Sequence, residues 1–466
     1  MTDAPPSDDP AERGTSRPGL VGRVRAAARE LRLPRPAEHV HLIGHLLRWI
    51  ALGSVVGVLA GVSSWALLGA LEWATSVRLE NPRLLLGLPV AGFVIGFVYY
   101  RWAGASVAGN NLLLDEIHDP QAWVPRRMAP LVYVATVITQ LFGGSAGREG
   151  TGIQMAGSLT DWFSRTVRLP PDDRRILLIA SLAGGFGAVF GVPMAGAVFG
   201  LEVQAVGRLR YEALVPALTA SVVGHQVVLA LGGHHAITPE LDIEIEPVLL
   251  LKVALAGLAF AAAGVLFIEL THTIKRLVAA AIPWPPARPI LGGVVIIALV
   301  LVVGGEDYLG LSLPLIADAI SGQPIGFEVF LLKILFTAVT LGTGFQGGEV
   351  TPLFVIGATL GAALGTVLGV PVEVMAAIGY VAVFAGAANT PLACTIMGVE
   401  LFGSDLVVPI AVACVVSFVF SSHRSIYGRQ RVAVAKDGDH EEQSAGPIER
   451  YRIRRRDPDP GTPDSP

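Results

Sequence analysis

The chain has 466 residues, of which 52% are hydrophobic and only 15% are charged, and its net charge is −4. Soluble domains carry about a quarter charged residues, so this composition excludes an ordinary soluble protein and predicts a membrane protein with several spans. Two cysteines, Cys394 and Cys414, give neither a disulfide framework nor a CxxC metal or redox motif.

The two ends of the chain are basic. Residues 1–40 carry several arginines without an apolar core, which excludes an ordinary secretory signal peptide. Residues 431–466 contain the RIRRR run beside an Asp-Pro-rich end, which is more typical of a solvated tail than of a nucleic-acid-binding segment. We therefore predict two disordered tails, without a folded regulatory domain in the second. Basic segments that flank membrane spans predict that both termini are cytoplasmic.

Apolar runs alternate with interrupted regions along the chain. The candidate membrane spans are residues 50–71, 84–100, 248–270 and 290–303. From 131 to 203, and again from 327 to 420, short apolar pieces are broken by Gly and Pro. Irregular backbone at membrane depth persists only where it is buried in protein or lines a cavity. These two regions therefore predict a transporter built from broken helices.

Two pairs of matching segments lie about two hundred residues apart in the same order. The pairs are GREGTGIQMAG at 147–157 with GGEVTPLFVIG at 347–357, and VPMAGAVFGLE at 192–202 with TPLACTIMGVE at 390–400. The first pair aligns Glu149 with Glu349 and Thr151 with Thr351. Two collinear matches predict that the membrane region consists of two related halves, 41–236 and 237–430. Such repeats in transporters are often inverted in the membrane.

The GREGT segment places Arg148 and Glu149 between glycines inside the hydrophobic region. The glycines permit close backbone approach, and the N-terminus of the helix that follows is an anion site. A carboxylate at this place competes with a transported anion, and its protonation would free the site. The alternatives are an Arg148–Glu149 ion pair or a first-turn glutamate stabilised by the helix dipole. We favour the functional interpretation, because intramembrane carboxylates are costly.

Other polar residues accompany apolar segments. Glu349 is either a second proton or cation ligand or a structural acid, and the sequence leaves both open. Asn110 and Asn111 precede a short apolar stretch, where one is expected to cap the helix and the other to donate to an anion. Thr351 can cap its helix or offer a hydroxyl to an ion. Tyr427 is either an interfacial residue or one whose hydroxyl reaches the pathway.

The remaining polar residues give little sign of chemistry. Glu202 and Glu400 end their apolar segments and are predicted to be structural or interfacial acids. His234 and His235 are too isolated in sequence to predict a metal site. No HExxH motif occurs in the membrane region, and no Walker loop or nucleophile elbow occurs in the chain. We therefore predict a protein that is not an enzyme and that needs no cofactor.

Taken in order, these motifs resemble the CLC family of chloride channels and anion/proton exchangers. The family signatures GSGIP, G(K/R)EGP and GxFxP and a late tyrosine correspond here to residues 109–113, 147–151, 347–352 and Tyr427. The resemblance implies an all-α polytopic membrane protein with the CLC fold, two inverted halves with broken helices. It also implies a homodimer with a separate pathway in each subunit, in which Glu149 is the gating glutamate that carries the proton.

The departures from these signatures are those of the CLC-F branch, the bacterial fluoride/proton antiporters. This chain has Asn110, Thr151 and Val350 where chloride relatives have Ser, Pro and Phe. It also has Val203 where the chloride/proton exchangers carry an inner proton-relay glutamate, so its proton route is expected to differ.

The resemblance implies a transporter in the bacterial inner membrane that exports fluoride in exchange for protons. The alternative is a chloride/proton exchanger or chloride channel of the same family. The residues implied to bind the anion are Asn110, Gly147, Arg148, Gly150, Thr151, Val350, Thr351 and Tyr427.

Overall fold

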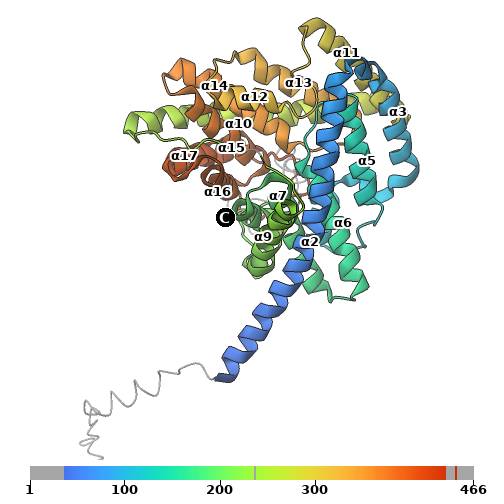
Figure 1. The fold of residues 1–466 in the computed structure, drawn as a ribbon, viewed down its shortest axis with the longest axis vertical. Coiled ribbons are helices and arrows are strands. Elements are labelled where there is room, and N and C mark those ends of the chain that lie inside the picture. The colour runs from blue at the N-terminus through green and yellow to red at the C-terminus, as the bar shows by residue number, and fades with distance from the viewer. Residues whose placement is uncertain (1–35, 236–237, 437–446, 449–466) are drawn as a thin grey trace, which may run out of the picture. The chain divides into compact units, whose positions relative to one another are not determined.

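The chain folds almost entirely into helices, as predicted (Figure 1). A computed structural model describes residues 36–235, 238–436 and 447–448. The strands within this part of the chain are two residues long, β1 (Ala205–Val206) and β2 (Arg431–Val432), and they pair in parallel.

The helices lie on both sides of the predicted boundary between the halves at residues 236 and 237. The first half contains α2 (Pro36–Glu80), α3 (Leu88–Val98), α4 (Asn110–His118), α5 (Met128–Leu141), α6 (Glu149–Thr166), α7 (Pro171–Phe190), α8 (Pro193–Glu202) and α9 (Leu214–Ala230). The second contains α10 (Pro247–Ala281), α11 (Arg288–Val303), α12 (Leu313–Ile320), α13 (Phe327–Thr343), α14 (Val350–Leu368), α15 (Val372–Ala388), α16 (Pro391–Phe402) and α17 (Val407–Phe420). The repeat therefore relates α5–α9 to α13–α17, and the short helices of each series are the broken pieces.

Apolar helices long enough to cross a membrane lie in both halves. The predicted spans at 248–270 and 290–303 correspond to α10 and α11. The predicted span at 84–100 lies within the candidate membrane span Pro82–His118, in which a short 3-10 helix (Pro82–Gly87) precedes α3 and a short π-helix (Tyr99–Ala103) follows it.

The predicted tails are shorter than expected at both boundaries. Helix α2 begins at Pro36, inside the segment predicted as the first tail. At the other end, β2 begins at Arg431, because the Arg431 N–H donates to the Gln204 carbonyl. The other residues of the predicted tails, 1–35, 437–446 and 449–466, lie outside the described part of the chain.

Helices α8 and α16 are repeat mates that cap one another. The Glu400 carboxylate accepts hydrogen bonds from the first N–H groups of α8, at Met194 (2.8 Å) and Ala195 (2.7 Å). The Glu202 carboxylate accepts equivalent bonds from the start of α16, at Leu392 (3.1 Å) and Ala393 (2.8 Å). Each carboxylate thus satisfies two N–H groups that have no partner within their own helix. The prediction that these acids are structural is confirmed.

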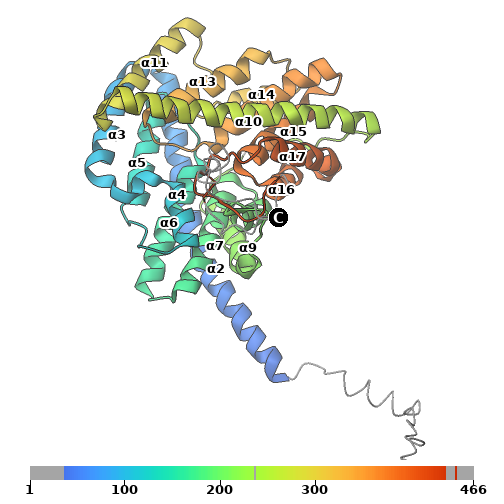
Figure 2. The same cartoon turned by 180° about the vertical axis from the view of Figure 1, so that it is seen from behind.

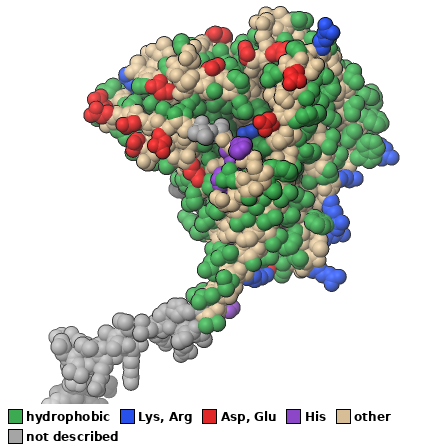
Figure 3. Space-filling view, viewed as in Figure 1, with side chains coloured by type: hydrophobic (Ala, Val, Ile, Leu, Met, Phe, Trp, Pro, Cys, Tyr) green, Lys and Arg blue, Asp and Glu red, His purple; other side chains and the backbone are tan. Residues whose placement is uncertain are grey.

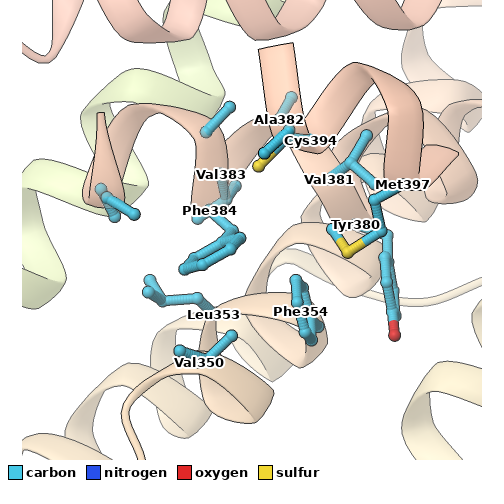
Figure 4. Packing of buried hydrophobic residues seen from close by; sticks show 14 of the residues in the cluster. Val350, Leu353, Phe354, Tyr380, Val381, Ala382, Val383, Phe384, Cys394 and Met397 are labelled. Atoms are coloured by element: carbon cyan, nitrogen blue, oxygen red, sulfur yellow. The ribbon is translucent and has the colours of Figure 1, made fainter. Parts of the chain in front are cut away.

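Close packing of α14 on α15 forms the centre of the second half. A Cβ on Gly357 would lie 2.1 Å from the Gly379 carbonyl oxygen, so only glycine permits this approach. Beside this contact, the rings of Phe354 and Tyr380 stack 4.5 Å apart, and Phe384 meets Phe354 edge-on (Figure 4). Such packing through small residues is typical of helices in membranes.

The outer surface of the helices is largely apolar. Figure 2 shows α10 lying across the helices of the second half, and it packs against α13, α15 and α17. Its other side exposes large side chains such as Leu251 and Leu255. Hydrophobic side chains also cover most of the face in Figure 3. This is the surface expected of helices in contact with lipid.

Candidate functional site

The two glycine-rich loops that precede α6 and α14 meet in the middle of the fold. The Gly147 N–H donates to the Gly348 carbonyl (2.6 Å), and the Gly348 N–H donates to the Gly147 carbonyl (2.7 Å). A Cβ on Gly147 would lie 2.7 Å from Thr351 Oγ1, so this approach requires glycine. The loop pair therefore brings two helix N-termini, one from each half, to the same place.

The Glu149 carboxylate lies at the N-terminus of the helix from the other half. Its Oε2 accepts hydrogen bonds from the Thr351 N–H (3.0 Å) and the Thr351 hydroxyl (2.5 Å) at the start of α14. The side chain is fully buried. An anion would bind at this place, because unpaired N–H groups and the helix dipole both favour negative charge there.

The contact between Arg148 and Glu149 is weaker than the hydrogen bonds between Thr351 and Glu149. Arg148 Nε lies 3.6 Å from Glu149 Oε1, and neither of these atoms has a hydrogen-bond partner. The Arg148 N–H lies 3.4 Å from Glu149 Oε2. The ion pair considered from the sequence is therefore present as a loose contact, while Thr351 holds the carboxylate.

Two predicted anion ligands turn their side chains away from the carboxylate. The Thr151 hydroxyl bonds to the Thr136 hydroxyl of α5 at 2.8 Å. The Val350 side chain packs among the apolar residues of the core near Phe384 (Figure 4). At Thr151 and Val350, the start of the helix therefore places the backbone at the site, and the side chain points elsewhere. Gly150 has a different role, because a Cβ there would lie 3.1 Å from Asn110 Nδ2.

The structure distinguishes the two neighbouring asparagines. Asn111 Oδ1 accepts a hydrogen bond from the Arg429 N–H (3.0 Å), so this amide fastens the segment that follows Tyr427. Asn110 Oδ1 and the Tyr427 hydroxyl are both buried without a partner. Both residues border a void of about 10 Å³ with otherwise apolar walls. The void holds about one water-sized particle, and within the described part of the chain Asn110 and Tyr427 are its only lining residues with polar side chains.

Two larger cavities lie beside the paired loops. The first, the Glu149 cavity, has a volume of about 350 Å³ and is lined by Arg148, Glu149, Phe190, Thr238, Thr351, Tyr380 and residues of α12. The second, the Glu349 cavity, has a volume of about 500 Å³ and is lined by Asn110, Asn111, Gln154, Lys275, Arg288, Glu349 and Tyr427, among others. The repeat-related glutamates therefore border different cavities, and the loop pair lies where the two halves meet.

A buried lysine in α13 was not predicted from the sequence. Lys333 is fully buried and donates to the hydroxyls of Ser145 (2.9 Å) and Ser312 (2.8 Å) and to two backbone carbonyls. Ser145 lies in the loop that leads to Gly147, and Ser312 directly precedes α12. Lys333 therefore connects the loop before α6 with the start of α12, and residues of α12 line the Glu149 cavity. A single lysine in the apolar VFLLKILF run is the signal that could have identified it.

Gln430 bonds to the backbone at Val203, the position where the resemblance implies a glutamate in the chloride/proton exchangers. Its Nε2 donates to the carbonyls of Val203 (2.8 Å) and Ala388 (3.0 Å), and its Oε1 accepts from Asn389 (2.8 Å). The backbone N–H of Gln430 donates to the Tyr427 carbonyl (3.0 Å). Gln430 therefore links the two halves and fixes the segment that carries Tyr427. Nothing in the sequence distinguished this glutamine from the polar residues around it.

We expect Gln430→Leu to leave these partners unsatisfied. The loss of a buried amide should lower the free energy of unfolding by about 1–3 kcal/mol. Thermal unfolding in detergent, followed by fluorescence or by size-exclusion chromatography, measures this change. Gln323→Leu removes an exposed amide and should leave the unfolding temperature unchanged. Equal stability of both variants would contradict a fastening role for Gln430.

Comparison with known proteins places these features in context. Residues 91–422 match the family model described as "Voltage gated chloride channel". A "Chloride/fluoride channel protein" of Pseudomonas syringae pv. tomato is 45% identical over 411 residues, which cover 86% of this chain and 90% of that protein. An "H(+)/Cl(-) exchange transporter ClcA" of Vibrio vulnificus is 26% identical over 75% of this chain and 81% of its own length.

Two solved structures resemble this fold. One, described as a CLC-type fluoride/proton antiporter, superposes with a TM-score of 0.80 at 32% identity, over 83% of this chain and 98% of its own. The other, a slow cyanobacterial Cl⁻/H⁺ antiporter, superposes with a TM-score of 0.69 at 20% identity, over 88% of this chain and 97% of its own. The second similarity concerns the fold alone.

Proposed function

Since this chain belongs to the voltage-gated chloride channel (CLC) family, we propose that it exports fluoride in exchange for protons. The observation that carries the proposal is the Glu149 carboxylate bound to Thr351 at the N-terminus of α14. The similarity to a fluoride/proton antiporter at 32% identity and to a chloride/fluoride channel protein at 45% identity supports fluoride as the anion.

The exchange follows from competition for one site. When Glu149 is ionised, its carboxylate accepts hydrogen bonds from the N–H and the hydroxyl of Thr351. A fluoride ion would otherwise accept these two hydrogen bonds. Protonation removes the charge that the helix N-terminus favours, so the side chain leaves and fluoride enters. When Glu149 loses its proton, the carboxylate displaces the anion again. Antiport requires in addition that the proton reaches Glu149 from one side of the membrane and that fluoride reaches the vacated site from the other, so that each cycle moves the two in opposite directions.

Fluoride is small and strongly hydrated. Each water molecule that it loses from its hydration shell must therefore be replaced by a hydrogen-bond donor of the protein. The backbone N–H groups of Arg148 and Gly150, at the start of α6, and of Thr351, at the start of α14, supply part of this replacement. The Thr351 hydroxyl supplies another donor. Toward the Glu349 cavity, the unpartnered Tyr427 hydroxyl can supply a further donor, and it borders, with Asn110, a void that holds about one water-sized particle. Thr151 acts in this proposal by fixing the start of α6 through Thr136.

Charge on the connecting segments supports an orientation in the membrane. The segments 231–246 and 304–312, next to the Glu149 cavity, contain glutamates and aspartates but neither lysine nor arginine. Lys275 and Arg288 line the Glu349 cavity, and Arg101 directly follows Tyr100, which also lines it. Because basic connections remain in the cytoplasm, we infer that the Glu149 cavity opens outward and the Glu349 cavity opens to the cytoplasm.

This orientation gives Glu349 a role to test. It borders the cytoplasmic cavity together with Lys275, and Val203 offers no proton carrier nearby. We propose that Glu349 is a proton or cation site on the cytoplasmic side of the pathway. We also propose that the protein lies in the bacterial plasma membrane as a homodimer with one pathway in each subunit, as the family resemblance implies.

We expect purified protein in liposomes to release fluoride at least about tenfold faster than chloride, a difference of roughly 1.4 kcal/mol between the two anions. Fluoride release should be accompanied by proton uptake into the vesicles. A fluoride electrode and a pH-sensitive dye inside the vesicles measure the two fluxes together. Equal rates for the two anions would instead support the alternative, a chloride/proton exchanger or chloride channel. Fluoride release without proton movement would contradict the antiport mechanism.

A further inference from the structure

Two histidines lie together on the Glu149 side of the fold. His225 belongs to α9, and His235 follows the same helix after a pair of glycines. Their ring centres are 5.2 Å apart and the rings are inclined by 34°. Figure 3 shows histidine side chains beside a hollow on this face of the molecule. His234 and His235 are too isolated in the sequence to predict a metal site, but the fold brings His235 beside His225.

The hydrogen bonding of His235 determines which of its nitrogens is free. Its Nε2 lies 3.0 Å from the Ala188 carbonyl oxygen, near the end of α7. A carbonyl can only accept, so Nε2 carries the hydrogen and Nδ1 keeps its lone pair. The Nδ1 atoms of His235 and His225 are both buried without a hydrogen-bond partner. Two buried, unpartnered imidazole nitrogens on neighbouring rings require an explanation such as a bound ion or water.

The local packing fixes the His235 ring in this position. A Cβ on Gly191, which has a φ of +85°, would lie 2.5 Å from the ring, so only glycine allows the ring to lie over the end of α7. Burial, and then the nearby His225 and Arg148, lower the pKa of His235, although its hydrogen bond to Ala188 opposes this. A lowered pKa keeps the imidazole neutral at neutral pH, and the neutral form is the one that binds metals.

The spacing of the rings matches that of a shared metal ion. Two imidazole nitrogens at about 2.0–2.1 Å from a tetrahedral metal place their ring centres roughly 5 Å apart. Metal-binding histidines also tend to donate their second ring N–H to a backbone carbonyl, which is the bond that His235 makes to Ala188. Within the described residues, no group of three or more His, Cys, Asp or Glu side chains could hold a metal, so water must complete the coordination.

We propose that His225 and His235 form a two-histidine binding site for a divalent transition metal, with Zn²⁺ as the best match. Imidazole ligands and tetrahedral geometry favour Zn²⁺ and Co²⁺ over the oxygen-loving Mg²⁺ and Ca²⁺. The His235 ring lies against Gly191, the residue after Phe190, which lines the Glu149 cavity. A divalent cation bound there adds positive charge beside this cavity and repels protons that approach through it.

Metal titration of the full-length purified protein tests the site directly. Co²⁺ serves as the probe, because tetrahedral Co²⁺ absorbs strongly in the visible range, and Zn²⁺ should displace it at a ratio of one per chain. We expect His225→Gln and His235→Gln each to weaken binding about tenfold or more, since each removes one ligand. His234→Gln, which removes the neighbouring exposed imidazole, is the matched control and should bind Co²⁺ as the unmodified protein does.

Flux measurements without metal show that each variant is folded, because none of these histidines belongs to the pathway. Adding Zn²⁺ outside the vesicles should slow fluoride release by the unmodified protein and by His234→Gln, but not by the other two variants. Absence of the tetrahedral Co²⁺ spectrum in the unmodified protein, or unchanged Co²⁺ affinity in His225→Gln and His235→Gln, would overturn the proposal. These binding results do not depend on which anion the protein transports.

Discussion

Glu149→Gln is expected to abolish the coupling between fluoride and protons while leaving a folded protein. Glutamine has nearly the same shape as glutamate but can neither carry the proton nor place a negative charge at the N-terminus of α14. Its amide can still reach Thr351, so the packing around the buried side chain is retained. Fluoride should then move down its own gradient, and proton uptake should fall to the leak of protein-free vesicles. The paired fluoride-electrode and internal-dye measurement reports both quantities.

The matched control is Glu72→Gln, which neutralises an exposed glutamate of α2. It should keep both the fluoride rate and the proton uptake of the unmodified protein. Proton uptake that persists in Glu149→Gln would mean that another group carries the proton, and Glu349 would be the first candidate. Loss of fluoride movement together with loss of proton uptake would mean that the carboxylate is needed to open the pathway and not only to couple it.

The internal repeat explains why much of this site was predictable. A repeat shows itself in sequence wherever both copies need the same residue type, as at Glu149 and Glu349 or at Glu202 and Glu400. Glycine before a helix start is likewise visible, because few other residues permit such close approach. These signals were sufficient to predict the broken helices, and they are the basis of the proposals for two related halves and for Glu149 as the gating glutamate.

Contacts between the halves could not be predicted in the same way. The sequence suggested that Glu149 lies at the start of its own helix, whereas its carboxylate binds Thr351 on the other half. The partners of Lys333 and Gln430 are carbonyls and hydroxyls distant in sequence, and such partners follow no spacing rule. Pairing of His225 with His235 depends on how the chain turns after α9, which hydrophobic periodicity does not determine.

Gly147→Ala is expected to disrupt the site through geometry alone. The added methyl group would lie 2.7 Å from Thr351 Oγ1, 2.9 Å from Pro352 Cδ and 3.0 Å from the Gly348 carbonyl oxygen. Two of these neighbours belong to the rigid start of α14, so the two loops must separate to admit the methyl group. Such overpacking costs about 1–3 kcal/mol of stability. It should also displace Thr351 from the Glu149 carboxylate and slow fluoride release at least about tenfold, since small misplacements at a binding site have large effects on rate.

Gly69→Ala provides the comparison that isolates this effect. Gly69 lies in α2, and a Cβ there meets nothing within 4 Å, so the same chemical change is made without a clash. Alanine also favours helix over glycine by about 1 kcal/mol, so this variant should unfold at an equal or higher temperature. If Gly147→Ala releases fluoride as fast as Gly69→Ala does, then the loops tolerate separation, and the close Gly147–Gly348 pair is not required for the anion site. If only Gly147→Ala fails, the approach of the two half-helices at these glycines is what creates the site that Glu149 and fluoride share.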